Sequence, residues 1–412
     1  MSGPAKLDFI PDIVTEHFDE LQFLWRRRRT ALRSPTDRER EIVALEERVE
    51  AHADAMLVIG DRLREYVDDS LAADDEMPAF AAAFVLLRQG APGAATRVAD
   101  VFEGASGKKL HGVAEALASA SATTGVAPRL TTLFLSGGPR VAAAAGEVLA
   151  FRGAVRPDRT HLERLLRAED PAVRAAAWRL AALSGAALPT SWYDVGLGDP
   201  DVGVTRAAVT AAAWAGAPAF ALHCHRVAST PDPESLEALR LFAAAAPPEE
   251  YQLVGAVASA PAWGPERFGV VGAFAHPYFI DLLIQEMSNP DPAAAAAAGR
   301  AFTKMTGRDV ESTTRVKVSP DGKPPADDFE AEFMDEVFLP NPDLARAHWQ
   351  ELAPQLAHAP RICRGMDVSR PLSREEVAAL DRESLWEYCL RARLFSGWQG
   401  TPLVLERYPQ RF

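Results

Sequence analysis

The sequence predicts an all-α protein: an α-solenoid of short helical hairpins, with a helical cap at its N-terminus and a mostly helical C-terminal extension. Three observations predict this fold class. Prolines that suit the first turn of a helix recur about 30 residues apart, as at Pro139, Pro171 and Pro200. A second break, rich in Gly, Ala and Pro, falls near the middle of each interval. Apolar residues recur at helical spacing between the breaks. Because one hairpin cannot bury its apolar face alone, neighbouring hairpins are expected to stack.

Residues 1–77 are expected to form the cap, because the end of a repeat stack needs a polar outer face. Two helices are predicted here, joined at Ser34-Pro35. The second is expected over 42–67, with four apolar residues on a common stripe: Ile42, Leu45, Val49 and Leu57.

Residues 78–307 are expected to hold about seven hairpins and a last single helix. Asp170 and Asp199 each precede a proline, where a carboxylate can cap free backbone amides. Small Ala and Gly positions allow neighbouring helices to approach closely. The predicted pairs are 78–90 with 92–103, 108–120 with 127–136, 139–151 with 157–168, 171–184 with 189–197, 200–215 with 218–229, 233–246 with 247–259, and 262–275 with 277–288, followed by a helix near 292–305.

Residues 308–412 lose this period. The segment 319–336 is rich in Gly, Pro and acidic residues and is predicted to be a mobile acidic loop. Helices are expected over 341–356 and 384–395, and Ser373 with Glu376 has the spacing of a capping box. The stretch "RICRGMDV" is expected to be a short strand or a turn.

The repeats resemble short HEAT-like repeats of the kind named after phycobilin lyases. The resemblance depends on "DPAVRAAAWRLAALSG" (170–185), with Asp170 and Arg174 at the family's positions, and on "AGRAFTKMTGRD" (298–309) as a repeat end. In the next repeat the Arg is displaced to Arg206.

The whole chain resembles a bacterial family of HEAT-repeat proteins often encoded beside type VI secretion components. The matching stretches include "HFDELQFLWRRR", "VFLPNPD" and "GTPLVLERYPQRF", and Asn341 stands where that family typically has a tryptophan. The resemblance implies a protein partner. It implies no catalytic site, because no catalytic residues are established for the family.

Composition excludes several function classes. The 412 residues carry a net charge of −13, which argues against nucleic acid or an anionic membrane as partner, because phosphate binding needs clustered Lys and Arg. The three cysteines, Cys224, Cys363 and Cys389, are odd in number and far apart, which suits a reducing compartment. No signal-peptide layout and no long uncharged apolar stretch occurs. A cytoplasmic protein without membrane or nucleic-acid contacts is therefore predicted.

The sequence offers little for catalysis or metal binding. His223, Cys224 and His225 form the only close ligand cluster, but residues two apart on a helix face different sides. "EGASGKK" (103–109) lacks the spacing of a phosphate loop and is expected to be an inter-repeat turn. "WRRRR" (25–29) spreads around its helix, which favours pairing with nearby acidic residues over a docking patch for an acidic partner. We therefore predict no catalytic residue, cofactor or metal.

Binding to another protein is the function that remains. Trp178 and Trp214 are expected in the core or in the packing between repeats, whereas second helices are expected to line the concave side of the stack. On that basis the candidate protein-binding residues are Arg159, Glu163, Trp192, Tyr193, His225, Arg226, Tyr251, Tyr278 and Asp281.

The leading hypothesis is a non-enzymatic protein-binding scaffold. By resemblance, it would be an adaptor or chaperone for a type VI secretion effector or secretion component. One alternative is an immunity protein that neutralises a cognate toxin, for which an acidic chain suits a basic partner. Others are an enzyme, such as a lyase acting on a chromophore, and a structural subunit of a larger machine.

Overall fold

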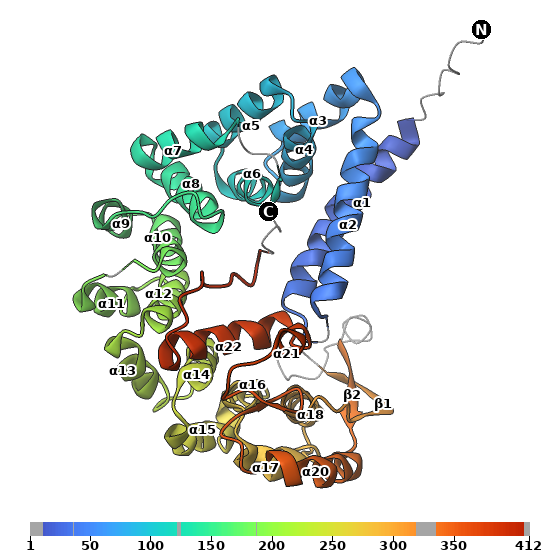
Figure 1. Ribbon diagram of the computed structural model, residues 1–412, viewed down its shortest axis with the longest axis vertical. Helices are drawn as coiled ribbons and strands as arrows, with labels where there is room; N and C mark the ends of the chain where they lie inside the picture. Colours follow the sequence, from blue (N-terminus) through green and yellow to red (C-terminus); the bar gives the residue numbers. More distant parts are fainter. Residues whose placement is uncertain (1–10, 36, 122–124, 187, 319–334, 408–412) are drawn as a thin grey trace, which may run out of the picture. The chain divides into compact units, whose positions relative to one another are not determined.

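The computed structural model describes residues 11–35, 37–121, 125–186, 188–318 and 335–407, and these are predominantly helical (Figure 1). The all-α solenoid class is confirmed. Contacts divide the chain into two compact units: unit 1 is Met1–Ala211 with Thr401–Phe412, and unit 2 is Ala212–Gly400. The predicted boundaries after residues 77 and 307 fall inside unit 1 and unit 2, respectively.

Unit 1 begins with a hairpin of two long helices, α1 (Pro11–Leu32) and α2 (Glu39–Leu57). The predicted join near Ser34-Pro35 is confirmed, and Ile42 packs with Ala31 and Leu32 between the two helices. The predicted helix over 42–67 is wrong in extent. It ends at Leu57 because Gly60 adopts a φ of 61°, a left-handed conformation that interrupts helical hydrogen bonding. A 3-10 turn, η1 (Gly60–Arg62), and α3 (Leu63–Ala72) follow.

Four hairpins follow in unit 1, and each predicted helix end lies within two residues of the observed one. Pro92, Pro139 and Pro171 begin their helices as expected. The pairs are α4 (Glu76–Gln89) with α5 (Pro92–Gly104), α6 (Gly107–Ser119) with α7 (Ala127–Ser136), α8 (Pro139–Phe151) with α9 (Arg159–Leu166), and α10 (Pro171–Ser184) with α11 (Thr190–Leu197). The next helix, α12 (Val202–Ala215), contains the boundary between the units.

Charged side chains connect successive hairpins of unit 1. Asp170 caps α10 by accepting from the Ala172 amide at 3.0 Å, and Arg140 of the preceding hairpin binds the same carboxylate. Arg174 reaches forward and binds Asp199 through two hydrogen bonds of 2.8 and 2.9 Å. Asp199 does not cap α12, because that helix begins at Val202; it accepts instead from the Asp201 amide. These pairs set the spacing of one hairpin on the next.

Unit 2 contains shorter helices, most of them entered through a proline-initiated 3-10 turn. The observed elements are α13 (Pro218–Val227), η2 (Pro233–Ser235) with α14 (Leu236–Ala245), η3 (Pro248–Glu250) with α15 (Tyr251–Ala258), η4 (Pro261–Trp263) with α16 (Arg267–Phe274), η5 (Pro277–Phe279) with α17 (Ile280–Glu286), and α18 (Pro292–Thr306).

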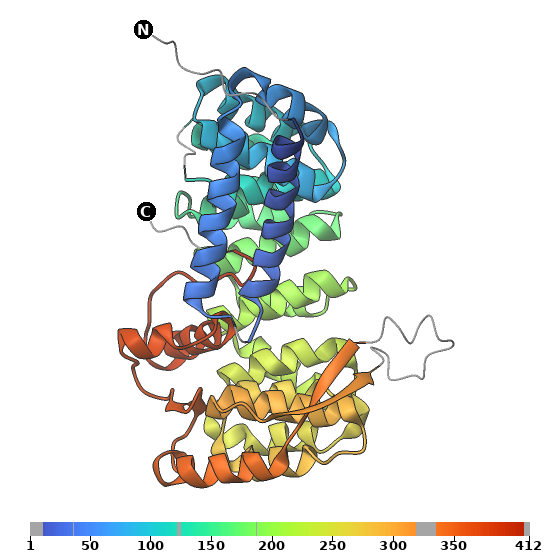
Figure 2. The same cartoon turned by 90° about the vertical axis from the view of Figure 1, so that its right-hand side faces the viewer.

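The C-terminal extension of unit 2 contains strands that were not expected. β1 (Glu311–Val318) pairs antiparallel with β2 (Asp335–Pro340), and the two extend along one edge of the unit (Figure 2). Of the predicted acidic loop, residues 319–334 lie outside the described residues, and 335–336 belong to β2, so the loop prediction is wrong there. The short strand or turn at "RICRGMDV" is confirmed as β3 (Ile362–Cys363) and β4 (Met366–Asp367).

The described part of the extension also contains the helices α20 (Pro342–Leu356), α21 (Arg374–Ala378) and α22 (Arg382–Phe395). The capping box of Ser373 and Glu376 is present at the start of α21. Trp214 is 2% exposed and meets the ring of Trp386 edge to face, with centroids 5.4 Å apart, so its predicted packing role is confirmed.

Several first helices in each unit lie between the second helices and a covering segment of the chain. In unit 2, α22 and β3 contact α14 and α18, and the second helices lie on the other side (Figure 1). In unit 1, α1 packs on α4, and Arg407 from the end of the chain binds Glu115 of α6. The expectation that second helices line the inner side is therefore wrong. In each unit, segments from near the chain termini cover part of that side, over α4 and α6 in unit 1 and over α14 and α18 in unit 2.

Candidate protein-binding site

The predicted binding residues of unit 1 differ from one another in exposure and in the contacts that they make. Arg159 and Glu163 form an ion pair of 2.6 Å along α9, both near the surface. Trp192 is half-buried beneath the guanidinium of Arg167, 5.1 Å from its ring centroid. Tyr193 is only 3% exposed and its ring packs on Trp178, with centroids 5.4 Å apart. Tyr193 is thus a core residue with almost no surface for a partner.

In unit 2, two predicted residues from successive hairpins come together at the surface. The rings of Tyr251 and Tyr278 lie 5.6 Å apart, centroid to centroid, and the residues are 41% and 67% exposed. Their outward position follows from their neighbours. Phe279, next to Tyr278, is 1% exposed and fills the core, so the preceding side chain points away from it. Pro277 fixes the backbone of this turn at its first position.

Further predicted residues extend this pair along the outer layer. His225 of α13 is exposed, and its Nε2 lies 3.3 Å from the Glu250 carboxylate, the residue before Tyr251. Asp281 is exposed one helical turn after Tyr278. Arg226 is also exposed, but it turns back to the Nδ1 of His223 at 2.9 Å.

Leu222 and Glu250 belong to the same surface and were not among the predicted residues. Leu222 is 72% exposed and stands one turn before His225, a spacing from which it could have been found. We call the surface formed by the following residues the tyrosine face: Leu222, His225, Glu250, Tyr251, Tyr278 and Asp281. It combines two aromatic rings and a large aliphatic side chain with two carboxylates.

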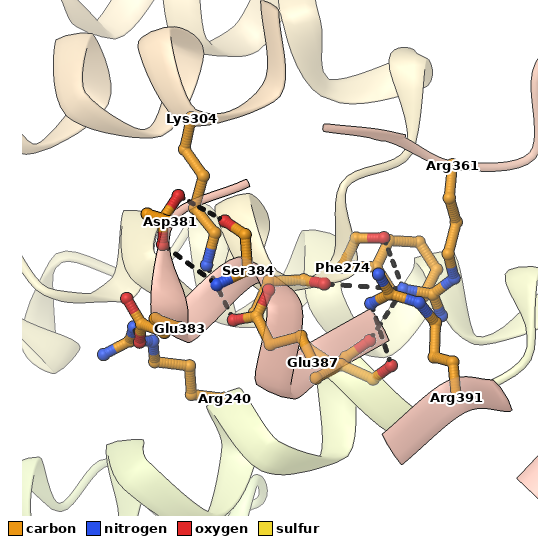
Figure 3. A network of polar contacts seen from close by, with 12 residues as sticks. Arg240, Phe274, Lys304, Arg361, Asp381, Glu383, Ser384, Glu387 and Arg391 are labelled. Carbon is orange, nitrogen blue, oxygen red and sulfur yellow. Dashed lines mark hydrogen bonds and ion pairs between the residues drawn. The ribbon is translucent and has the colours of Figure 1, made fainter. Parts of the chain in front are cut away.

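A second cluster of polar groups is buried within unit 2 (Figure 3). Lys304 donates to Glu387 at 2.6 Å, and both side chains are largely buried. Arg364 and the Ser384 hydroxyl both donate to the same oxygen of Asp381, each at 2.7 Å. These bonds fix the start of α22 against α18 and β3.

Two arginines of this cluster bind the ends of helices. Arg361 donates to the Phe274 carbonyl at 2.6 Å and the Ala243 carbonyl at 3.0 Å, at the C-termini of α16 and α14. Arg391 donates to the Ala244 carbonyl at 3.3 Å. Burial raises the pKa of the Cys363 thiol, which therefore stays neutral and is a poor nucleophile. The cluster joins the C-terminal extension to the hairpins and does not resemble a catalytic site.

Most residues of the basic run 25–29 make intramolecular contacts. This confirms the interpretation that the run pairs with nearby acidic residues. Trp25 is fully buried and stacks on Phe80, with ring centroids 3.7 Å apart. Arg28 is buried and pairs with Glu46, and Arg29 pairs with Glu76.

Two other motifs also have structural roles. "EGASGKK" is an inter-repeat turn, since α5 ends at Gly104 and α6 begins at Gly107. The first two residues of the His223–His225 cluster are buried, His223 at 9% and Cys224 at 0%, whereas His225 is exposed, so its imidazoles are separated as predicted.

A surface hollow of about 360 Å³ lies in unit 1 beside this turn. Three of its four charged lining residues are already engaged: Arg97 pairs with Asp68 at 2.5 Å, and Lys109 donates to the Ala72 carbonyl at 2.8 Å. The hollow thus lacks the converging polar groups expected of a small-molecule site.

No protein-family model matches the chain, and no curated protein matches it. Within the described ranges, no cluster of three or more His, Cys, Asp and Glu side chains could hold a metal ion. None of the helices in those ranges combines the length and the apolar character that crossing a membrane requires.

Proposed function

We propose that the protein is a non-enzymatic scaffold that binds another protein through the tyrosine face. The pair formed by Tyr251 and Tyr278 carries this proposal, because tyrosine is enriched at protein interfaces and is prominent among the residues that dominate binding energy. The ring of Tyr278 packs on that of buried Phe279, with centroids 5.3 Å apart, and the ring of Tyr251 packs on Tyr278, so the pair would lose little side-chain freedom on binding.

The charges around the face support a partner of particular character. Glu250 and Asp281 flank the tyrosines, and the whole chain has a net charge of −13. Such a surface attracts a partner that presents Lys or Arg around an apolar centre, and the long-range field would raise the association rate.

The biological role we propose is that of an adaptor or chaperone for a type VI secretion effector or secretion component. Its support is the resemblance of the terminal sequences, from "HFDELQFLWRRR" to "GTPLVLERYPQRF", to proteins encoded beside such systems. A basic effector would match the acidic tyrosine face. Neutralising a toxin in the producing cell would use the same complementarity.

The test uses the proteins encoded by genes next to this one. Each is purified and titrated into the full chain by isothermal calorimetry, and the double variant Tyr251→Ser/Tyr278→Ser is compared with the wild type. We expect one of them to bind, and the double variant to bind at least about 30-fold more weakly, since each interface tyrosine contributes roughly 1–2 kcal/mol.

The matched control is Phe23→Ser/Val58→Ser, which removes two exposed apolar residues of unit 1, 59% and 78% exposed. It should bind as the wild type does. If no neighbouring product binds, or if the tyrosine variant binds with unchanged affinity, the proposal fails. Rescue of growth from a bound toxin in cells without a secretion system would identify the immunity role.

A further inference from the structure

The end of the chain places an arginine into the interior of unit 1. Residues 401–407, which we call the tail, run without helix or strand past α8 toward α6 (Figure 1). Arg407 is 7% exposed; its guanidinium carbon lies 5.6 Å from the ring centroid of Phe151. The tail therefore lies across the first helices as an extended peptide.

The partner of Arg407 is a buried carboxylate on α6. Glu115 is 2% exposed, and both Nε and Nη2 of Arg407 lie 2.8 Å from its Oε1 atom. Its other oxygen, Oε2, is buried without a hydrogen-bond partner. A buried carboxylate requires a cation and hydrogen bonds. Here two N–H groups of one planar guanidinium converge on Oε1 and supply both the charge and the hydrogen bonds, which makes arginine the fitting occupant.

The tail has the properties of a ligand. It lies 292 residues after Glu115 and contains no helix or strand, so its departure would disrupt neither. Its second charged contact, from Glu406 to Arg33, lies at the surface, with side chains 52% and 63% exposed. Arg407 thus carries a charged contact of the tail into the interior.

We propose that Glu115 and Phe151 form a binding site for an arginine side chain on an extended peptide. The tail occupies this site in cis, and an arginine-bearing segment of a partner protein takes its place when the tail leaves. The site lies in unit 1 and is independent of the tyrosine face in unit 2. Because the tether keeps the tail at an effective concentration on the order of 1 mM, a competing segment binds the intact chain weakly.

The experiment measures binding in trans of a fluorescein-labelled peptide with the sequence of residues 401–412, TPLVLERYPQRF. The receptor is the chain truncated after Gly400, checked for folding by circular dichroism. Fluorescence polarisation should show binding to the truncated chain that is at least about 30-fold tighter than to the intact chain. The same peptide with glutamine in place of Arg407 should bind at least about tenfold more weakly.

Two receptor variants locate the site. Glu115→Gln in the truncated chain should weaken binding at least about tenfold. The matched control Glu103→Gln changes an exposed glutamate of α5 that pairs with Arg129, and it should leave binding unchanged. If the truncated chain does not fold, the intact chain with Arg407→Ala serves instead, and it should bind the labelled peptide more tightly than the intact wild type does.

The proposal is overturned if a folded truncated chain does not bind the peptide at 1 mM, a concentration comparable to that of the tethered tail. It is equally overturned if the glutamine peptide binds as tightly as the arginine peptide, or if the Arg407→Ala chain gains no affinity.

Discussion

Single arginines bind the C-terminal ends of the first helices. The last carbonyls of a helix lack internal partners and carry the negative end of its dipole. Arg361 satisfies carbonyls of two successive helices at once, and its guanidinium lies 4.8 Å from the ring centroid of Phe274. Burial lowers its pKa to about 9, so it stays protonated at neutral pH. The cation therefore remains available to both helix ends.

We expect Arg361→Met to lower the free energy of unfolding by about 3 kcal/mol or more, because methionine fills the space but leaves buried carbonyls unpaired. Urea titration followed by circular dichroism measures the change. Arg370→Met is the control: it breaks the exposed pair with Glu376 and should cost less than about 1 kcal/mol. If both variants lowered the free energy of unfolding equally, Arg361 would have no special role in stabilising the helix ends.

At the scale of elements, first helices approach each other where one of them lacks a side chain. Gly112 lies on α6 against the start of α4, and a Cβ atom added there would be 2.2 Å from the Glu76 carbonyl oxygen. The predicted close approach of small residues is confirmed at this position. The obstacle is backbone, so the helices themselves would have to move apart.

Gly112→Ala should therefore destabilise the protein by about 1–3 kcal/mol, although alanine is the better helix former. Gly93→Ala on α5 provides the comparison, because nothing lies within 4 Å of the added Cβ. That variant should be neutral or stabilised by up to about 1 kcal/mol. The thermal unfolding midpoint should fall for Gly112→Ala and stay the same or rise for Gly93→Ala, and a stabilised Gly112→Ala would refute the packing argument.

The strands β1 and β2 were not predicted, although the sequence of β1 alone favours a strand. β1 contains "STTRVKV", a run of β-branched residues that favours a strand. Its partner begins only at Asp335, after a segment rich in Gly, Pro and acids, whereas hairpin loops usually have two to five residues. Val316 pairs with Val337, which lies far away in the sequence, and the residues between them favour a loop. The sequence near β1 therefore does not indicate its partner.

For the whole molecule, helix positions were predictable because their signals are short-range. Prolines and capping carboxylates fixed most helix ends. The covering of the first helices was not predictable, because it depends on contacts such as Arg361 with Ala243, 118 residues apart. The binding residues divide in the same way: Tyr193 lies on α11 and Tyr278 in the turn η5 before α17, but Trp178 from another helix buries only Tyr193.

The C-terminal extension should therefore be part of the folding unit that begins near α12. A fragment of residues 199–400 keeps Trp214 against Trp386 and keeps Arg361 on its helix ends, and we expect it to unfold cooperatively in urea. A fragment of residues 199–307 would expose the apolar faces of α14, α16 and α18. It should unfold at a lower urea midpoint, with a broad transition and strong binding of the dye ANS. Matching midpoints for the two fragments would mean that the hairpins of unit 2 are stable without the extension, and that the buried arginines add nothing essential to them.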